Sequence, residues 1–394
     1  MGVTVKPKRF LPFLFLRSKD LPRLGTRSRS PVLAFCLLLT PSCLLLLTSC
    51  KDIGIPPDRI IPDTTSHGPD TTSHNFIWTI DTLGDGSGGY LYGVAIINDT
   101  LAYAGGEIYL KDSSGQIDPI RYNLARWNGR SWNLSRLQFP QYNSDCTIAF
   151  YSPGFVRSVF AFTANSVLFT DGLSVIRWNG TTFISYPCVS LSLIGNGRFQ
   201  NIWGVSESDF YCVGTGGTIF HFANSAWTKI ESGVSDEAFR FSDIWGIAMG
   251  NGSELVLAVG SDFALEHRVI ALVASSARDT LDWIFDKIPY SVWFSGNSGY
   301  YIAGDGLRKR EKTWEVIDST VFFHRVRGNA ENDLFVFGGG LQTTLRHFNG
   351  STWREYTELQ IPFGFARDLA VKGSVAMAVG YADDVPYVIR GHRY

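Results

Sequence analysis

Charged side chains recur just before short apolar runs in this sequence, and their types could bind an acidic ligand or act on it. Arg157, Arg325 and Arg367 each precede such a run, and Asp243 and Asp368 occupy comparable places. Clustered guanidinium groups bind carboxylates, and a sialidase-like glycosidase site would add a Tyr nucleophile with a partner Glu, and an acid. Spacing alone pairs no nucleophile with a base, so we assign no catalytic residue and favour a non-catalytic interpretation.

Composition and motifs restrict the class of ligand. The chain has no G-x-S-x-G, phosphate-loop, H-E-x-x-H or C-x-x-C motif, so we expect no cofactor and no metal centre. Eight of the 35 Lys and Arg residues and one of the 36 Asp and Glu residues precede Cys50. The remaining 27 basic and 35 acidic residues give a net charge of about −8. This sign is opposite to that of a nucleic-acid-binding protein, so nucleic acid is not an expected partner.

The first 49 residues have the order of a secretory signal peptide. A basic stretch is followed by an apolar run from Pro31 to Leu47, which Pro41 interrupts and which is short for a membrane span. The run ends in Leu47-Thr48-Ser49-Cys50, which resembles the lipobox of bacterial lipoproteins. That resemblance implies acylation of Cys50 and stable anchoring by more than one acyl chain. We therefore predict a lipid-anchored protein of the cell envelope, at the outer membrane or cell surface.

Residues 50–75 read as a tether between the lipid and the folded part. The segment repeats a Pro-Asp-Thr-Thr-Ser-His motif that ends at His67 and at His74. Two histidines seven residues apart raise the alternative of a metal site. A polar, proline-containing segment with no apolar period is more typical of a disordered spacer, and we predict the spacer.

Three cysteines remain after Cys50. Cys146 and Cys188 fall in the loops before the second and third repeat units described below, on the same face of neighbouring units. We predict a disulfide between them, which an exported protein permits. Cys212 falls within an apolar run and is predicted to be a small buried side chain.

Residues 76–394 contain a repeat with three landmarks, numbered by their order along the repeat unit. The second landmark is an apolar run that ends in Gly, as in "FYCVG" and "LFVFG". The third is a pair of aromatic residues five apart around a turn, as in "WNGRSW" and "FNGSTW". The first is an aliphatic residue followed by an aromatic residue or a Gly step: Leu91-Tyr92-Gly93, Val159-Phe160, Ile202-Trp203-Gly204, Ile244-Trp245-Gly246, Val292-Trp293, Val326-Arg327-Gly328 and Leu369-Ala370.

This repeat predicts an all-β, seven-bladed β-propeller of four-stranded antiparallel blades. Asn128-Gly129, Asn179-Gly180 and Asn349-Gly350 lie between apolar runs, which favours type I′ hairpin turns. Four short strands every ~40–50 residues are typical of a propeller blade. An all-β sandwich with coincidental spacing is the alternative.

The two ends of the repeat array complement each other. The last unit ends in "YVIRGHRY" without a fourth strand, and the array begins with an unpaired strand at residues 76–83. We predict that residues 76–83 complete the last blade and close the ring, because an open array would leave exposed sheet edges.

The unit resembles the "IWGxSxxDxYAVGxxGxIxHYxGxxW" repeats of exported bacterial lipoproteins from the Bacteroidetes and Chlorobi, some of which carry a glucosyltransferase-like name. It is more distantly similar to Asp-box and kelch propellers. Trp127 stands where an Asp box has its Asp, and most units lack the double Gly of kelch repeats. The resemblance implies the architecture and the location of the protein more than its chemistry.

Long loops mark the surface where we expect binding. Residues 105–121 and 137–155 are insertions on the face that holds the starts of the first strands, and long loops on a rigid scaffold often carry function. The aromatic residues of the first landmark, Tyr92, Phe160, Trp203, Trp245 and Trp293, are predicted to pack in the core, with sugar stacking as the alternative. The predicted binding residues on this loop-rich face are Tyr142, Phe150, Tyr151, Arg157, Asn201, Asp243, Arg325 and Asp368.

We therefore predict a monomeric, membrane-anchored module that binds or assembles a protein or a glycan. A carbohydrate-active enzyme with a sialidase-like site and an assembly factor for a membrane complex are the alternatives.

Overall fold

The computed structural model describes residues 71–234, 237–249, 254–262, 267–273, 276–279, 287–296, 299–339, 343–359, 361 and 363–394. The predicted signal peptide, Cys50 and the tether up to residue 70 lie outside these residues. Within the described part, no helix has the length and apolar character needed to cross a membrane.

The described residues form antiparallel sheets, most of which have four strands, as the repeat predicted. The second strands, such as β13 and β23, are buried along almost their whole length, which explains their continuous apolar runs. Outer strands such as β5 alternate between partly buried and exposed residues. Four sheets contain four consecutive strands: β2 (Gly89–Asn98), β3 (Leu101–Ile108), β4 (Tyr122–Trp127) and β5 (Trp132–Ser135); β8 (Ser158–Thr163), β9 (Ser166–Thr170), β10 (Val175–Trp178) and β11 (Phe183–Ser185); β12 (Phe199–Ser206), β13 (Asp209–Gly214), β14 (Ile219–Ala223) and β15 (Ala226–Lys229); β16 (Arg240–Ala248), β17 (Glu254–Ser261), β18 (His267–Val273) and β19 (Ser276–Asp279).

A six-stranded sheet follows in the chain. It consists of β20 (Pro289–Trp293), β21 (Tyr300–Arg310), β22 (Trp314–Ala330), β23 (Asp333–Gly338), β24 (Thr344–Phe348) and β25 (Trp353–Glu355). Its long strand β22 takes part in two separate ladders. Residues 314–322 pair with β21, whereas residues 323–330 pair with β23.

The last sheet joins the two ends of the propeller, as predicted. It consists of β26 (Phe365–Lys372), β27 (Val375–Ala382), β28 (Val385–Arg393) and β1 (Phe76–Thr82), and β1 pairs with β28 from Phe76↔Arg393 to Thr82↔Tyr387. Residues 71–75, which we had predicted to be part of the tether, also contact this end of the fold. The Thr72 amide donates to the Asn349 carbonyl at 2.9 Å, and His74 Nδ1 lies 2.8 Å from His347 Nδ1.

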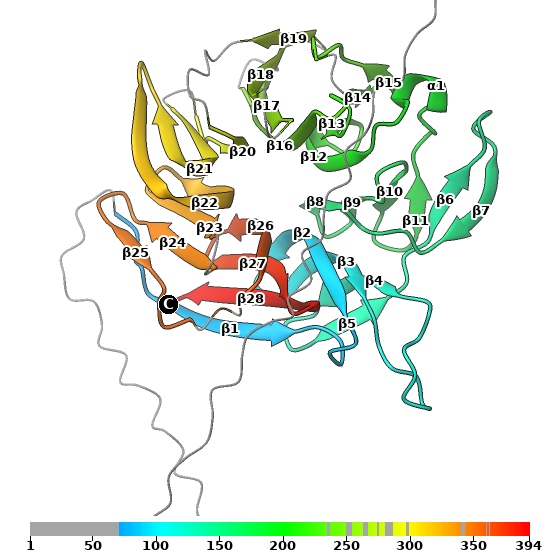
Figure 1. Cartoon of the computed structure of the whole chain (residues 1–394), viewed down its shortest axis with the longest axis horizontal. Helices are drawn as coiled ribbons and strands as arrows, with labels where there is room; N and C mark the ends of the chain where they lie inside the picture. The colour runs from blue at the N-terminus through cyan, green and yellow to red at the C-terminus, as the bar shows by residue number, and fades with distance from the viewer. Residues whose placement is uncertain are drawn as a thin grey trace, which may run out of the picture. The chain divides into compact units, whose positions relative to one another are not determined.

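The first strand of each repeat lies on the inside of a ring (Figure 1). These inner strands are β2, β8, β12, β16, β20, the second half of β22, and β26, and each contacts the next around a closed cycle. Apolar clusters fill the spaces between successive sheets, for example Trp203, Tyr211 and Ile244 between the sheets of β12 and β16. The core is therefore divided among the sheet interfaces.

The register corrects the predicted alignment of the first repeat. In β12, Ile202 and Trp203 pair with Cys212 and Tyr211, and the equivalent positions of β2 are Val94 and Ala95. We had aligned Leu91-Tyr92-Gly93 with Ile202-Trp203-Gly204, which is wrong by three residues. The Leu91-Tyr92-Gly93 sequence has the residue types of the first landmark, but it lies three residues before the equivalent position in the strand.

The turns at the Asn-Gly sites also differ from the prediction. Trp127 pairs with Trp132 across a four-residue loop, in which Asn128 Oδ1 accepts hydrogen bonds from the amides of Arg130 and Ser131, both at 2.9 Å. Only the glycine of each Asn-Gly pair has a positive φ, so these loops are not type I′ turns. Two-residue loops with positive φ at both positions occur instead at Asn224-Ser225 and Asp383-Asp384.

A two-stranded hairpin projects from the ring beside β11 (Figure 1). It consists of β6 (Phe139–Tyr142) and β7 (Ile148–Ser152) and lies in the predicted 137–155 insertion. A disulfide joins Cys146 in its turn to Cys188, whose Cα lies 5.6 Å away, just before the short helix α1 (Leu191–Ile194). Cys212 is a free, fully buried thiol in β13.

Candidate functional site

A polar residue begins almost every inner strand at the same structural position. In β12 this residue is Asn201, which follows a β-bulge after Phe199, and Asp243 follows the same bulge in β16. Bulges redirect side chains, and here they turn the side chain towards the neighbouring strand. The residues at this position, which we call the pin residues, are Ser158, Asn201, Asp243, Ser291, Arg325 and Asp368, with Gly93 in β2.

Asp243 is the most highly bonded pin residue. Its side chain is completely buried, and Arg327 binds both carboxylate oxygens, at 2.7 and 2.9 Å. Asn201 Nδ2, Ser291 Oγ and the Val292 amide donate to the same carboxylate, at 2.7, 2.6 and 3.1 Å. One aspartate therefore ties together β12, β16, β20 and β22.

Other pin residues make similar links around the ring. Arg325 Nε donates to Asp368 Oδ1 at 2.8 Å, and the Val94 amide donates to Asp368 Oδ2 at 2.9 Å. Ser158 Oγ donates to Asn201 Oδ1 at 3.1 Å. Asp243 and Arg325, which we had predicted on a binding face, are thus buried contacts between sheets. The polar residues before the apolar runs do share a role, but that role is to link the inner strands of the ring.

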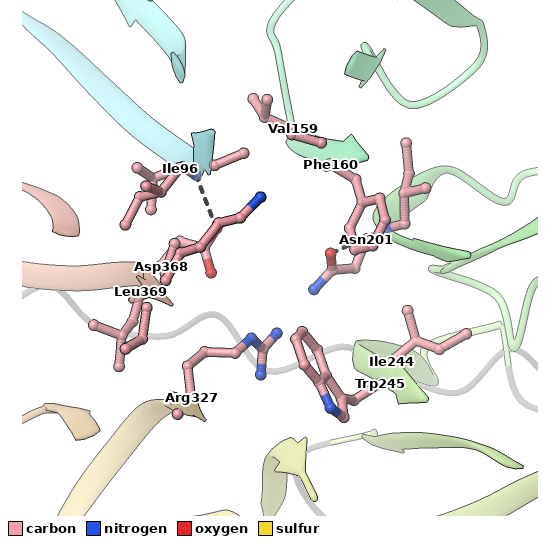
Figure 2. Close-up of a pocket in the computed structure, with 17 residues that line it drawn as sticks. Ile96, Val159, Phe160, Asn201, Ile244, Trp245, Arg327, Asp368 and Leu369 are labelled. Atoms are coloured by element: carbon pink, nitrogen blue, oxygen red, sulfur yellow. Dashed lines mark hydrogen bonds between the residues drawn. The ribbon is translucent and has the colours of Figure 1, made fainter. Parts of the chain in front are cut away.

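A cavity of about 190 Å³ lies where the inner strands converge (Figure 2). Asn201, Arg327 and Asp368 supply polar groups to its wall, and Trp245 lies beneath the Arg327 guanidinium, 4.8 Å from its ring centroid. Pockets for drug-sized ligands have volumes of about 300–1,000 Å³. This cavity can hold water or a small ion, whereas a peptide or an oligosaccharide must bind elsewhere.

The aromatic residues of the first landmark have mixed positions. Trp203 and Trp293 are buried, as predicted for core packing, and Phe160 and Trp245 are partly exposed and line the cavity. Tyr92 does not belong to this set, because Ala95 occupies its predicted place. Arg327 occupies the equivalent place in β22 and reaches Asp243 from there.

Four arginines surround the strand-entry end of the ring, and we call them the arginine rim: Arg157, Arg198, Arg240 and Arg367. Arg157 and Arg198 both lie against Gly172, where an added Cβ would be 2.9 Å from Arg157 Nε and 3.5 Å from Arg198 Cβ. Arg198 and Arg240 both pair with the backbone of Thr215. These three arginines therefore form a continuous arc across the sheets of β8, β12 and β16.

Arg367 extends the rim on the other side of Tyr92. Its guanidinium lies 5.8 Å from the ring centroid of Tyr92 and 5.2 Å from that of Tyr381, and its Nη2 donates to the Tyr381 hydroxyl at 2.9 Å. Arg367 Nε is buried and has no hydrogen-bond partner among the described residues. The neighbouring Phe365 is 55% exposed. Arginine and aromatic side chains in this mixture are enriched at the centres of protein interfaces.

The rim carries positive charge that no close ion pair neutralises. None of its four arginines forms an ion pair within the described residues, whereas nearby Arg121 and Arg325 pair with Glu107 and Asp368. Burial lowers the pKa of Arg157 and the charges of Arg240 and Arg198 lower it further, whereas Tyr92 and the Asp171 carboxylate act in the opposite direction.

His324 adds a neutral imidazole on the β22 side of this end of the ring. Burial and the charges of Arg325 and Arg367 lower its pKa to about 3, so the ring is uncharged at neutral pH. Its Nδ1 is buried and lacks a hydrogen-bond partner in the described part of the chain. Such groups are rare in native proteins and indicate a polar partner such as water or a ligand.

The predicted aromatic binding residues lie on the hairpin beside this end of the ring. Phe150 and Tyr151 in β7 are 61% and 56% exposed. Tyr142 is only partly exposed, because its hydroxyl donates to the Tyr186 carbonyl at 3.3 Å. Arg121, from the 105–121 insertion, donates to the Pro153 carbonyl at 3.1 Å. The two insertions are therefore held together at one edge of the loop-rich face.

Of the predicted binding residues, Arg157 belongs to the rim, and Asn201 and Asp368 line the cavity. Arg198 and Arg240 were not among the binding residues predicted from the sequence. The signal was present, because "RFQNIWG" and "RFSDIWG" place an arginine three residues before each pin residue.

The described residues of the site are poorly arranged for glycoside hydrolysis. Asp368 is the single carboxylate among the residues that line the cavity, and it is already bound by Arg325 and Val94. A tyrosine nucleophile needs a base within hydrogen-bond reach. Burial and the charge of Glu107 raise the pKa of Tyr92. Glu107, the candidate base beside Tyr92, instead accepts a hydrogen bond from the Tyr109 hydroxyl, at 3.2 Å.

No protein-family model and no curated protein sequence matches the chain. Solved structures resemble its fold. YCF48 bound to D1 peptide superposes with a TM-score of 0.54 at 10% identity, over 82% of this chain and 99% of that one. The WD40 propeller domain of Doa1 gives 0.53 at 12% identity over 78% and 95%, and YCF48 from Cyanidioschyzon merolae gives 0.52 at 10% identity over 80% and 98%. At this identity the likeness shows the fold alone, which is an all-β propeller with four-stranded antiparallel blades.

Proposed function

We propose that the protein is a non-catalytic binding module that holds an acidic segment of a partner protein on the arginine rim. The observation that carries the proposal is the arc of Arg157, Arg198 and Arg240, continued by Arg367, with no ion pair to a carboxylate in the described residues. Carboxylates bind arginine through charge-assisted hydrogen bonds, and Arg367 Nε and His324 Nδ1 offer buried, unused polar atoms beside it.

The scaffold suits a protein ligand. The cavity is too small for an extended ligand, so binding takes place on the rim and on the hairpin, where Phe150 and Tyr151 are exposed. YCF48, whose fold is similar, has been solved with a bound D1 peptide. That protein supports the class of ligand proposed here and not its sequence.

We further infer a ring of seven blades. The six-stranded sheet holds two ladders that meet on β22. We therefore count β21 and β22 as two consecutive strands each, and the second half of β22 as the inner strand of the next blade. With this division, seven inner strands form the cycle, in agreement with the seven sequence repeats. The closed ring presents a single rim, and we propose that the protein acts as a monomer.

The proposed binding is tested with a short Asp- and Glu-rich peptide and its Asn- and Gln-substituted counterpart, titrated into the purified full-length chain. We expect the acidic peptide to bind, and Arg157→Glu and Arg240→Glu each to weaken binding by about tenfold or more. The affinity should fall as salt rises, because exposed charges are screened.

Arg354→Glu is the matched control, since Arg354 is equally charged but lies on outer strand β25 and forms an exposed pair with Glu358. Equal binding of both peptides, or an unchanged affinity after both rim substitutions, would contradict the proposal. Turnover of arylglycosides that Tyr92→Phe abolishes would instead support the carbohydrate-active enzyme.

The proposed location is a membrane surface outside the cytoplasm, with lipid on Cys50. The support for it is the lipobox-like Leu47-Thr48-Ser49-Cys50 after an apolar run. In cells that process lipoproteins, we expect Cys50→Ala to move the protein from the membrane fraction to the soluble fraction. Cys212→Ala is the control, because that thiol is buried in β13. Unchanged membrane partitioning of Cys50→Ala would refute the anchor.

A further inference from the structure

A cluster of three metal-ligating side chains lies at the far end of the inner strands from the arginine rim. Asp209 begins β13, His221 lies in the neighbouring β14, and Glu254 begins β17 of the next sheet. His221 Nε2 is 2.7 Å from Asp209 Oδ1, and one ligand atom from each of the three residues lies within 4.8 Å of the others. The cluster therefore joins two successive sheets.

Tyr211 orients two of these side chains. It lies opposite His221 in the strand register, and the two rings stack at 4.0 Å between centroids with an angle of 3°. The Tyr211 hydroxyl donates a hydrogen bond to Glu254 Oε1, and within the described residues the second oxygen of Glu254 accepts no hydrogen bond. Partners of this kind, which fix the rotamer and orientation of a ligand, are typical around bound metals. All four residues lie on strands, so the arrangement is positioned by rigid elements.

The charges of the cluster favour a cation. Two carboxylates flank one imidazole, and the His221 side chain is only 11% exposed. The two negatively charged carboxylates repel each other at short distance. A divalent ion between them removes this repulsion.

We propose that Asp209, His221 and Glu254 bind a divalent transition-metal ion of the zinc type. Zinc binds histidine nitrogen at ≈ 2.0–2.1 Å and carboxylate oxygen at ≈ 2.0–2.2 Å, and three protein ligands with one water form a common site. Ligand atoms already within 4.8 Å of one another reach these distances by small side-chain rotations.

This inference goes beyond the proposed function, because the cluster lies at the end of β12 opposite the rim and is independent of the peptide. The ion would link the sheet of β12–β15 to that of β16–β19. Binding of an ion to the folded state alone raises its apparent stability.

The test uses the full-length chain, stripped with a chelator and titrated with Co²⁺ as a spectroscopic probe and with Zn²⁺ in thermal unfolding. We expect visible cobalt absorption bands of a low-symmetry site, displacement of cobalt by zinc, and a higher Tm with zinc. Glu254→Gln and His221→Gln should each weaken cobalt binding by more than about tenfold, the scale on which even indirect partners of a metal act. His392→Gln, at an exposed histidine on β28, should leave binding unchanged.

Two results would overturn the proposal. One is the absence of cobalt bands and of a zinc-dependent Tm shift in the wild-type chain. The other is wild-type affinity in both His221→Gln and Glu254→Gln. If the His221 variant does not fold, Asp209→Asn decides the matter, because the Asp209 side chain is 41% exposed at a strand end and its replacement disturbs packing least. Wild-type cobalt affinity of that variant would count against the site.

Discussion

Replacing Asp243 with alanine is expected to lower the free energy of unfolding by about 3–5 kcal/mol, the range measured when one partner of a buried ion pair is removed. The substitution leaves the Arg327 guanidinium, which is 7% exposed, without its carboxylate partner. It also removes the acceptor for Asn201, Ser291 and the Val292 amide. The effect is large because one side chain links four inner strands.

Denaturant unfolding at neutral pH measures this loss, with Arg354→Ala as the control. Arg354 and Glu358 form an ion pair whose side chains are 42% and 52% exposed, and such pairs contribute about 0–1 kcal/mol. The double variant Asp243→Leu, Arg327→Leu should recover part of the loss, since it leaves no unpaired buried charge. A loss below about 1 kcal/mol in Asp243→Ala would show that the pair does not hold the ring together.

The pH dependence of this contribution follows from the sign of the pKa shift. Burial raises the pKa of the Asp243 carboxyl, but the charges of Arg327 and Arg325 and the hydrogen bonds outweigh burial and hold it below its ordinary value. The stabilisation is therefore fully present above the unfolded-state pKa of about 3.9 and is lost as the pH falls through the lower folded-state value. The difference between the wild type and Asp243→Ala should shrink below about pH 4.

The architecture could be predicted from the sequence because every repeat must meet the same packing requirements. The buried second strands require continuous apolar runs, and runs such as "FYCVG" and "LFVFG" are visible without a structure. The first repeat was misaligned because the bulge between Leu91 and Gly93 and a small residue at Ala95 replace the usual aromatic pattern. The turn type was mistaken because Asn128 uses its side chain, and not a positive φ, to stabilise the loop.

The site was harder to predict, because its residues come from different repeats. The sequence indicates that Asp243 and Arg325 begin strands, but not that Arg327 reaches from β22, beyond β20, to bind Asp243 in β16. Arg198 and Arg240 belong to successive repeats, and the packing of their two sheets brings both to the backbone of Thr215. Spacing within one repeat therefore identified polar positions, whereas their partners depend on the contacts between repeats.

A chain that starts at residue 84 is expected to lose the closed ring, with a destabilisation above about 5 kcal/mol, beyond the usual range for a single substitution. It lacks β1, whose residues pair with β28 along its whole length. Asp81 binds Arg390 of β28 at 2.5 Å and accepts a hydrogen bond from Trp132 of β5 at 2.9 Å. Trp78 packs 4.9 Å from Tyr356, between ring centroids. Removal of β1 thus breaks contacts to three sheets.

A chain that starts at residue 71 is the matched control, since it keeps β1 and the contacts of Thr72 and His74 with the fold. Without β1, strand β28 presents an unpaired edge, which favours association with other chains. Size-exclusion chromatography and thermal unfolding should show a monomer for the longer chain, and aggregates with a lower Tm for the shorter one. A synthetic peptide of residues 71–83 should restore the monomer in part, because strand addition satisfies the exposed edge. If the shorter chain were a monomer with an unchanged Tm, closure by β1 would not be what holds the last sheet in the ring.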